Sequence, residues 1–277
     1  MMFYATIRQR KGEVILVNGI FDEPGDFYYS GDADKTKNSV TEHYHGIYEI
    51  YYLKSGRCNY FIDDTLYEVR AGNIVFIPNG VIHNTNYSEP HTRRLINCSA
   101  DYIPPSLVSK IDSLPRLYRN KRISIEADRI FSRIEEEYTR ADGFSKDALK
   151  CYVGELFFLF LRSEDSPSDT AERRSIAQRA AKYARENYCS QIGLSDTAAR
   201  LGVTAEHLSR SFKKEIGFGF SEYLLMLRLQ KAEYMLKNEP GRSISEIAFA
   251  CGFNDSNYFS DKFKRAYGIP PSYLKRK

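Results

Sequence analysis

The sequence predicts an α+β protein of two domains, a β-barrel with appended helices followed by an all-α domain with two helix-turn-helix motifs joined by a long helix. Short β-branched and aromatic runs fill the chain up to about residue 97, helical periodicity follows, and one motif recurs after about 50 residues in the last third. A length of 277 residues allows two ordinary domains. We expect a first domain over 1–162 (barrel about 1–100, helices about 105–162), a linker over 163–172 and a second domain over 173–277.

The first part of the chain is typical of a sandwich or barrel. Turn residues such as Gly56 and Pro78–Asn79–Gly80 separate short runs at regular intervals. The runs expected to form strands are Ile47–Leu53, Cys58–Ile62, Leu66–Val69, Ile74–Ile77 and Arg94–Ile96.

Two helical patterns come next, and each places apolar residues on one face. The first face carries Ala127, Ile130, Phe131, Ile134 and Tyr138, and the second carries Leu149, Tyr152, Val153, Leu156, Phe157, Phe160 and Leu161. Two interpretations stay open from these residues. The stripes pack the helices against the β domain, or they form a dimer interface, because two antiparallel helices leave an apolar face to cover.

Charge divides the chain at a polar segment. Ser163–Glu172 contains Pro and lacks periodicity, which is typical of a linker. From Ala171 to Lys277 the chain holds 19 Lys and Arg and 11 Asp and Glu, a net charge of +8, while the other 170 residues have a net charge of −4. This division indicates a second domain that meets a polyanion.

The repeat in the basic half predicts two helix-turn-helix motifs, at about 192–215 and 243–266. LSDTAARLGV aligns with ISEIAFACGF, and HLSRSFKKEIG aligns with YFSDKFKRAYG. Gly202 and Gly252 each supply the left-handed conformation that ends a first helix. Thr204 in one copy, and Asn254 or Asp255 in the other, would cap the second helix.

One long helix is expected between the two motifs. It would begin at Ser221 as its N-cap and continue to Asn238, before Glu239–Pro240–Gly241. A rigid helix there would fix the distance between the two helix-turn-helix motifs. We expect them to bind two successive major-groove segments, about 34 Å apart on one face of DNA.

These residues resemble the AraC/XylS family of bacterial transcription regulators over about Ile176–Leu274. The resemblance is carried by LSDTAARLGVTAEHLSRSFKKEIG, FSEYLLMLRLQKA and ISEIAFACGFNDSNYFSDKFKRAYGIPPSYL. It implies that the second helix of each motif contacts DNA. The DNA-binding candidates are Thr204, Glu206, His207, Ser209, Arg210, Lys213, Lys214, Asn254, Ser256, Asn257, Ser260, Asp261, Lys262 and Lys264.

The candidates have different expected roles. Arg210 could make a bidentate contact to guanine, and Asn257 could pair with adenine. The four lysines are candidates for phosphate contacts. Asp261 departs from the family pattern, which often carries Arg or Lys there. It would accept from cytosine, pair with Lys262 or Arg265, or mark a second motif that binds DNA more weakly.

Four of the five histidines lie in the expected barrel. The pattern His43-x-His45-x3-Glu49-x6-Gly56, followed by Gly72-x5-Pro78-x-Gly80-x2-His83, resembles both motifs of the cupin barrels. His43, His45 and Glu49 share strand parity and can point into the barrel together. Three imidazoles and a carboxylate suit Zn, Ni, Fe or Mn. In the resembled family such residues also hydrogen-bond a ligand without metal.

We therefore expect these residues to line an effector pocket, with or without a metal. The pocket candidates are His43, His45, Glu49, Tyr51 and His83. Aromatic residues crowd the same strands, and those that face inward could stack on a sugar ring or another planar ligand. His91, outside the pattern, is expected at the surface or in a loop.

The leading interpretation is an effector-responsive transcription activator without catalytic residues. It implies four partners: double-stranded promoter DNA, a small-molecule effector, RNA polymerase and a second copy of the chain. The alternatives are a metal-dependent cupin enzyme with a DNA-binding tail and a constitutive architectural protein.

Three further features of the sequence predict a cytoplasmic location. Five cysteines without a C-x-x-C pair favour a reducing cytoplasm. The N-terminus lacks the apolar run of a signal peptide, and the longest apolar run, Leu156–Leu161, is far too short for a membrane span.

Overall fold

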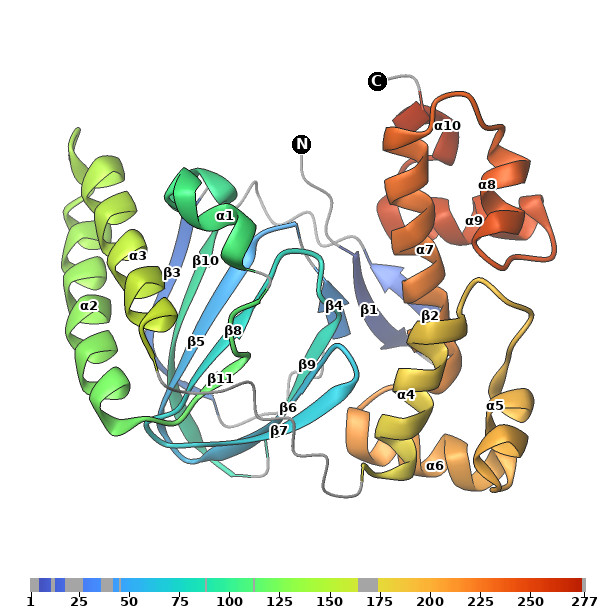
Figure 1. Cartoon of the computed structure of the whole chain (residues 1–277), viewed down its shortest axis with the longest axis horizontal. Coiled ribbons are helices and arrows are strands. Elements are labelled where there is room, and N and C mark those ends of the chain that lie inside the picture. The colour runs from blue at the N-terminus through green and yellow to red at the C-terminus, as the bar shows by residue number, and fades with distance from the viewer. Residues whose placement is uncertain are drawn as a thin grey trace.

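The computed structural model describes residues 5–10, 13–17, 27–35, 42–44, 46–87, 89–111, 113–163 and 174–275, with side chains over 27–31 and from 46 onward within these ranges. Figure 1 shows a sheet-rich body with helices α2 and α3 on its outer side and a wholly helical body beside it. This arrangement confirms the predicted fold class. Within the described ranges, no helix is both long and apolar enough to cross a membrane.

Two antiparallel sheets form the barrel. The first has the order β2 (Glu13–Val17), β1 (Ala5–Arg10), β4 (Glu42–Tyr44), β9 (His83–Tyr87), β6 (Arg57–Ile62) and β7 (Thr65–Arg70). The second has the order β11 (Leu117–Tyr118), β8 (Ile74–Ile77), β5 (Tyr48–Ser55), β10 (His91–Cys98) and β3 (Phe27–Lys35). Strands β1 and β2 also contact α9 of the helical body.

The five predicted runs fall in β5, β6, β7, β8 and β10 to within a few residues at their ends. Strand β9 was not predicted, because HNTNY is polar and carries no apolar alternation. The expected linker, Ser163–Glu172, lies outside the described residues except for Ser163.

The central strand β5 faces two different cores. Tyr51 and Leu53 lie in the barrel interior with Cys58 and Val75. Tyr48, Ile50 and Tyr52 lie on the opposite face, in the core beneath the helices. This split follows from the two-residue period of a strand, which sends alternate side chains to opposite faces.

Helices α2 (Lys121–Arg140) and α3 (Ser145–Leu161) cover the outer face of the second sheet, after the short η1 (Ala100–Tyr102) and α1 (Pro105–Ile111). Most of both predicted apolar stripes is buried there, in one core with the sheet. On β10, buried Arg94 donates to Asp128 and Ser132 of α2 at 3.2 and 3.1 Å. The packing interpretation is therefore confirmed for most of the stripe residues, and the dimer interface stays a prediction.

The helical body contains both predicted motifs. The first is α5 (Leu194–Leu201) with α6 (Ala205–Ile216), and the second is α8 (Ile244–Ala250) with α9 (Ser256–Tyr267). Helix α7 (Phe220–Asn238) joins them, and α4 (Ile176–Asn187) and α10 (Pro271–Lys275) flank them.

The ends of these helices follow the expected local chemistry. Gly202 and Gly252 adopt φ of 73° and 88°. The Thr204 hydroxyl accepts from the His207 amide at 3.1 Å, and the Asp255 carboxylate accepts from the Tyr258 amide at 2.6 Å. Both caps satisfy backbone donors that the first helical turn leaves free.

The predicted start of the long helix was wrong by two residues. Gly219, not Ser221, is the N-cap of α7, and the Glu222 carboxylate accepts from the Gly219 amide at 2.6 Å. The helix begins earlier because Phe220, its first residue, is buried in the domain core. Tertiary packing of an aromatic ring thus outweighs the local preference for a serine cap.

Gly252→Ala should destabilise the helical body more than Gly202→Ala. Positive φ costs an L-residue about 1–2 kcal/mol, which is the loss expected at Gly202. A Cβ at Gly252 would also lie 2.5 Å from the Tyr188 carbonyl oxygen, whereas one at Gly202 meets nothing within 4 Å. Overpacking adds roughly 1–3 kcal/mol at Gly252. Urea unfolding followed by circular dichroism measures both losses, and equal losses would contradict the steric argument.

Candidate functional site

One of the candidate pocket residues is a buried carboxylate, Glu49. Glu49 on β5 is only 4% exposed. Its Oε1 accepts a hydrogen bond of 2.6 Å from the Tyr60 hydroxyl, and its Oε2 lies 3.8 Å from His83 Nε2. With its amide oriented to satisfy its hydrogen bonds, Asn97 also donates to Oε2 at 3.3 Å. A buried carboxylate needs such partners, since burial without them is costly.

Glu49 and His83 are the two members of the predicted quartet that the structure brings together. The backbone of His43 on β4 is paired directly with that of His83 on β9. The side chain of His43 and the whole of His45 lie outside the described residues. Among described side chains, no group of three or more potential metal ligands occurs. A metal site would need both of these histidines and stays a prediction.

Two further tyrosines lie on nearby strands, Tyr51 on β5 with Glu49, and Tyr87 on β9 next to the strand of Tyr60. Tyr51, a predicted pocket residue, lies 3.2 Å from Tyr87 between hydroxyl oxygens, and its ring meets that of Tyr60 edge-on. Burial, with the charge of Glu49 second, raises the pKa of Tyr60 well above its usual value. Burial also raises the pKa of Tyr51, and it raises that of Tyr87 to about 12. These hydroxyls therefore stay protonated at neutral pH. Tyr60 donates its proton to Glu49, and one hydroxyl of the Tyr51–Tyr87 pair can donate to a ligand.

The sequence analysis did not assign Tyr60, Tyr87 and Asn97 to the pocket. Tyr60 was among the aromatic residues on the strands, but its inward direction depends on the register of β6. Tyr87 and Asn97 lie on β9 and β10, whose exact extents were not predicted.

The prediction for His91 was wrong. It is 2% exposed at the start of β10, and its ring stacks on that of Tyr87 with 3.4 Å between centroids. The sequence placed β10 only over Arg94–Ile96, so the strand position of His91 was missed.

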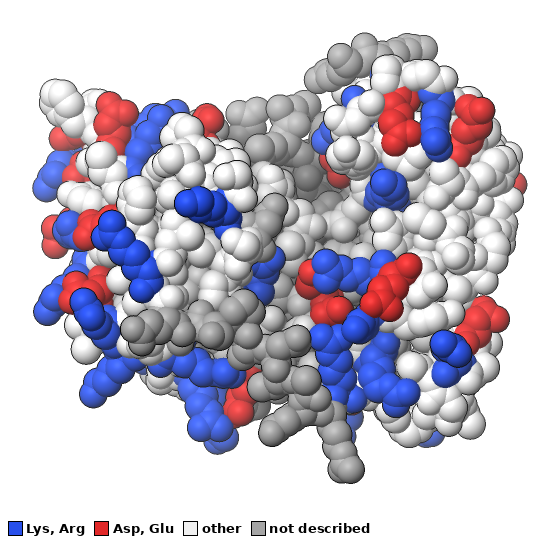
Figure 2. All heavy atoms as spheres, viewed as in Figure 1, with Lys and Arg blue, Asp and Glu red and all other residues white. Residues whose placement is uncertain are grey.

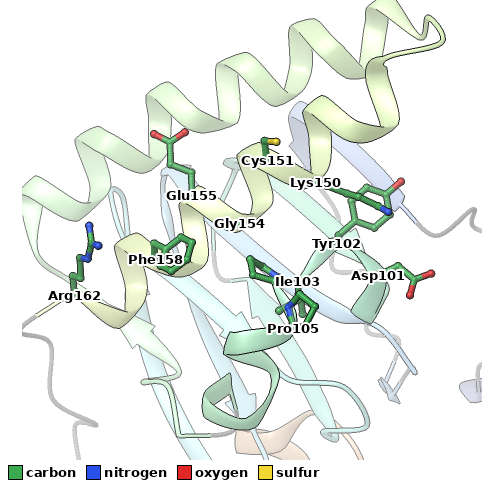
Figure 3. Close-up of a pocket in the computed structure, with 11 residues that line it drawn as sticks. Asp101, Tyr102, Ile103, Pro105, Lys150, Cys151, Gly154, Glu155, Phe158 and Arg162 are labelled. Carbon is green, nitrogen blue, oxygen red and sulfur yellow. The ribbon is translucent and has the colours of Figure 1, made fainter.

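One groove lies outside the barrel, on the side of the helices. It has a volume of about 650 Å³ and runs between α3 and the segment of η1 and α1. Figure 3 shows Lys150 and Phe158 of α3 on one wall and Tyr102, Ile103 and Pro105 on the other. Phe158 is 41% exposed there. No residue of this groove was a predicted site residue.

The first helix-turn-helix motif presents its candidates to solvent. The side chains of Thr204, Glu206, His207, Ser209, Arg210, Lys213 and Lys214 are all exposed. Arg210 forms an ion pair of 3.2 Å with Glu206 one turn earlier. Such a pair is weak at an exposed site, so it leaves the guanidinium available for DNA.

The candidate side chains of the second motif are less exposed than those of the first. Asn254, Asn257, Asp261 and Lys264 are exposed, and Ser256, Ser260 and Lys262 are half-buried. Asp261 pairs with Arg265 at 3.0 Å, one of the alternatives that the sequence allowed. The amine of Lys262 lies over the Tyr258 ring, 5.2 Å from its centroid. In the view of Figure 2, blue Lys and Arg side chains lie on both bodies with red acidic ones among them.

Comparisons with known proteins match both bodies. Residues 28–150 match the AraC-like ligand binding domain, and residues 197–277 match a helix-turn-helix domain. The chain is 23% identical over 242 residues to the HTH-type transcriptional activator RhaR of Mannheimia succiniciproducens, covering 83% of this chain and 85% of that one. It is 23% identical over 251 residues to RhaS of Klebsiella pneumoniae, covering 87% and 89%.

A similar solved structure is the C-terminal domain of AraT, a response regulator from Geobacillus stearothermophilus. It is 32% identical and covers 38% of this chain and 87% of that chain, with a TM-score of 0.36.

A ligand-binding barrel joined to paired helix-turn-helix motifs defines a DNA-binding transcription regulator that responds to an effector. The chain belongs to the AraC/XylS family of these regulators.

Tyr60→Phe should destabilise the barrel by about 1–3 kcal/mol, because Oε1 of the buried Glu49 carboxylate loses its donor. Tyr28→Phe is the matched control, since Tyr28 is 42% exposed on the same domain. Urea unfolding of the full chain measures both free energies of unfolding. A loss for Tyr60→Phe no larger than that of the control would show that the hydrogen bond contributes nothing.

Proposed function

We propose that this protein is a transcription activator, not an enzyme, and that a small polyhydroxylated effector such as a sugar binds around Glu49 inside the barrel. The observation that carries this proposal is a buried carboxylate that accepts from the Tyr60 hydroxyl, with the paired hydroxyls of Tyr51 on β5 and Tyr87 on β9, in one chain with two exposed helix-turn-helix motifs. The similarity to RhaR and RhaS, which are named as activators, supports the sign of regulation.

The chemistry of the pocket favours hydroxyl groups on the ligand. Glu49 is an acceptor, whereas Tyr51, Tyr60 and Tyr87 offer hydroxyls that donate or accept. A polyol presents both donors and acceptors and can match such a mixed set. The face of an aromatic ring such as Tyr60 packs against the apolar face of a sugar ring.

A divalent metal remains an alternative occupant of the same pocket. Zn, Ni, Fe or Mn would need His43 and His45 beside Glu49 and His83. The 2.6 Å hydrogen bond from Tyr60 to Glu49 instead supports a metal-free, ligand-binding role. Element analysis of protein purified without chelators, with His45→Ala as control, distinguishes the two. Stoichiometric metal that is lost in His45→Ala would favour the metal.

The active form in this proposal is a homodimer that contacts promoter DNA and RNA polymerase. The groove beside Phe158 supports a second copy, because its apolar wall on α3 is left open by the packing of α2 and α3 on the barrel. Sedimentation of the wild type against Phe158→Glu tests this, and an unchanged mass would exclude this groove as the interface.

In the DNA interface, we expect some residues to contact bases and others to contact phosphates. Arg210→Ala should weaken binding to the operator by about 1–3 kcal/mol and relax the preference at one base pair, as loss of a bidentate contact does. Lys264→Ala should weaken binding to all sequences and reduce the salt slope by about 1. Lys237→Ala is the control, because Lys237 pairs with Glu233 on α7, outside both motifs.

Fluorescence anisotropy with promoter fragments across a salt series measures these effects, with and without each member of a sugar panel. An affinity for DNA that depends on neither sequence nor salt would contradict the DNA-binding assignments. If no sugar changes the affinity for DNA or the thermal stability, the proposed effector class is wrong.

A further inference from the structure

Two successive arginines of β10 face opposite sides of the second sheet. Arg94 reaches out to α2, where it donates to Asp128 and Ser132. Arg93 lies directly opposite Leu53 of β5, a residue of the core inside the barrel. Directly opposed residues of an antiparallel pair share a face, so the Arg93 side chain faces the barrel interior.

The guanidinium of Arg93 differs from that of its neighbour in its partners. Arg93 is half-buried and its Nη1 atom is buried, yet among the described residues that atom has no hydrogen-bond partner. A guanidinium has a fixed positive charge, and a buried N–H without an acceptor is unfavourable. A donor of this kind suits an anionic ligand, which supplies an acceptor and the opposite charge in one group.

The strand is irregular on both sides of Arg93. The register of β10 shifts against β5 between Thr92 and Arg93, and it shifts against β3 between Arg93 and Leu95. Irregularities of this kind aim individual side chains and are common beside binding sites. The distortion of β10 therefore lies where a strand would have to aim a ligand-binding side chain.

Arg93 lies close to the hydroxyl pair of Tyr51 and Tyr87. The ring of Tyr87 stacks on His91, which is two residues before Arg93, or about 7 Å along a strand. Burial raises the pKa of Tyr87, and the positive charge of Arg93 opposes that shift. Because one hydroxyl of the pair has a proton to donate, Arg93 and the pair together offer donors to a carboxylate.

Glu49 lies further along the same inner face. Asn97 is the direct partner of Glu49 across the β5–β10 ladder, and Arg93 lies four residues before Asn97. Four residues of a strand span about 13 Å. A cation and a carboxylate thus lie at separate places on one face. This spacing favours a ligand with a carboxylate at one end and hydroxyl groups at the other.

We propose that Arg93 and the Tyr51–Tyr87 pair bind a carboxylate of the effector, which is therefore a sugar acid, a uronate or an aldonate, and not a neutral sugar. This inference rests on the proposed function in taking the barrel interior as the site of a polyhydroxylated effector. The planar guanidinium donates two N–H bonds to the carboxylate, and the hydroxyls of the effector donate to Glu49.

The same arrangement selects the acid over the neutral sugar. A site built around a buried donor rejects an analogue that lacks the acceptor, because the donor is then left unpaired. A carboxylate without hydroxyl groups satisfies Arg93 but makes no hydrogen bond at the Glu49 end. Arg93 is thus a specificity-determining residue for the effector.

The first experiment measures the stability of the full chain, refolded from urea to remove any bound effector. Arg93→Met removes the charge and the N–H donors, and Arg70→Met is the matched control because Arg70 is exposed on β7, paired with Glu68. We expect the urea midpoint of Arg93→Met to equal or exceed that of the control, since groups kept for binding add little to stability. A midpoint clearly below that of the control would show that Arg93 has a structural partner and would overturn the proposal.

The second experiment measures binding to the full chain by isothermal titration calorimetry. The probes are glucose, galactose and mannose, the uronate and aldonate of each, and hexanoate, a six-carbon carboxylate without hydroxyls. We expect at least one sugar acid to bind about tenfold or more tightly than its neutral sugar. Arg93→Met should lower that affinity by about ten- to hundredfold, as loss of a hydrogen bond to a charged group does. Arg93→Lys should restore part of the affinity, and Arg70→Met should leave it unchanged.

The outcomes separate this inference from the proposed function. A neutral sugar that binds as tightly as its acids, and equally to the wild type and Arg93→Met, would overturn the role of Arg93 and leave the polyhydroxylated effector standing. Hexanoate that binds through Arg93, without binding of any sugar or sugar acid, would support the carboxylate contact and contradict the polyhydroxylated class. If no probe binds, both are wrong.

Discussion

Successive side chains of a β-strand point to opposite faces, and β5, β6 and β9 each use both faces. On β5, odd-numbered residues such as Glu49 face the barrel interior, while Tyr48 and Ile50 pack beneath α2 and α3. On β6 and β9, the inner residues hold Glu49 and the outer residues hold the helical body. The barrel interior, the face beneath α2 and α3 and the face against the helical body therefore all depend on strand register. A slip of one residue in a strand would move its side chains to the opposite face.

The helical body depends on a different local device, used twice. In each motif a glycine with positive φ ends the first helix, and a polar side chain then caps the second. The glycine has no Cβ and can adopt the positive φ that a tight turn requires. This turn fixes the angle between the two helices of the motif. The same construction at α5–α6 and α8–α9 leaves the polar faces of α6 and α9 outward, where DNA contacts are expected.

Much of the fold was predictable because its signals are local. Strand alternation, the two apolar helical stripes, the repeat with Gly202 and Gly252, and the caps at Thr204 and Asp255 each depend on residues close in the sequence. The errors have the opposite character. Strand β9 is polar, His91 is buried by neighbours from other strands, and α7 starts early because Phe220 enters a core assembled from several helices.

The sequence alone determined the class of this protein: an acidic barrel with a clustered carboxylate and histidines, joined to a basic pair of helix-turn-helix motifs. Only the tertiary structure decided what each face does. The apolar stripes of α2 and α3 cover the barrel, Tyr60 joins Glu49, and Phe61 beside it docks the helical body. Local patterns specify which side chains share a face. The element that packs against that face can lie more than a hundred residues away in the sequence, so a local pattern does not identify it.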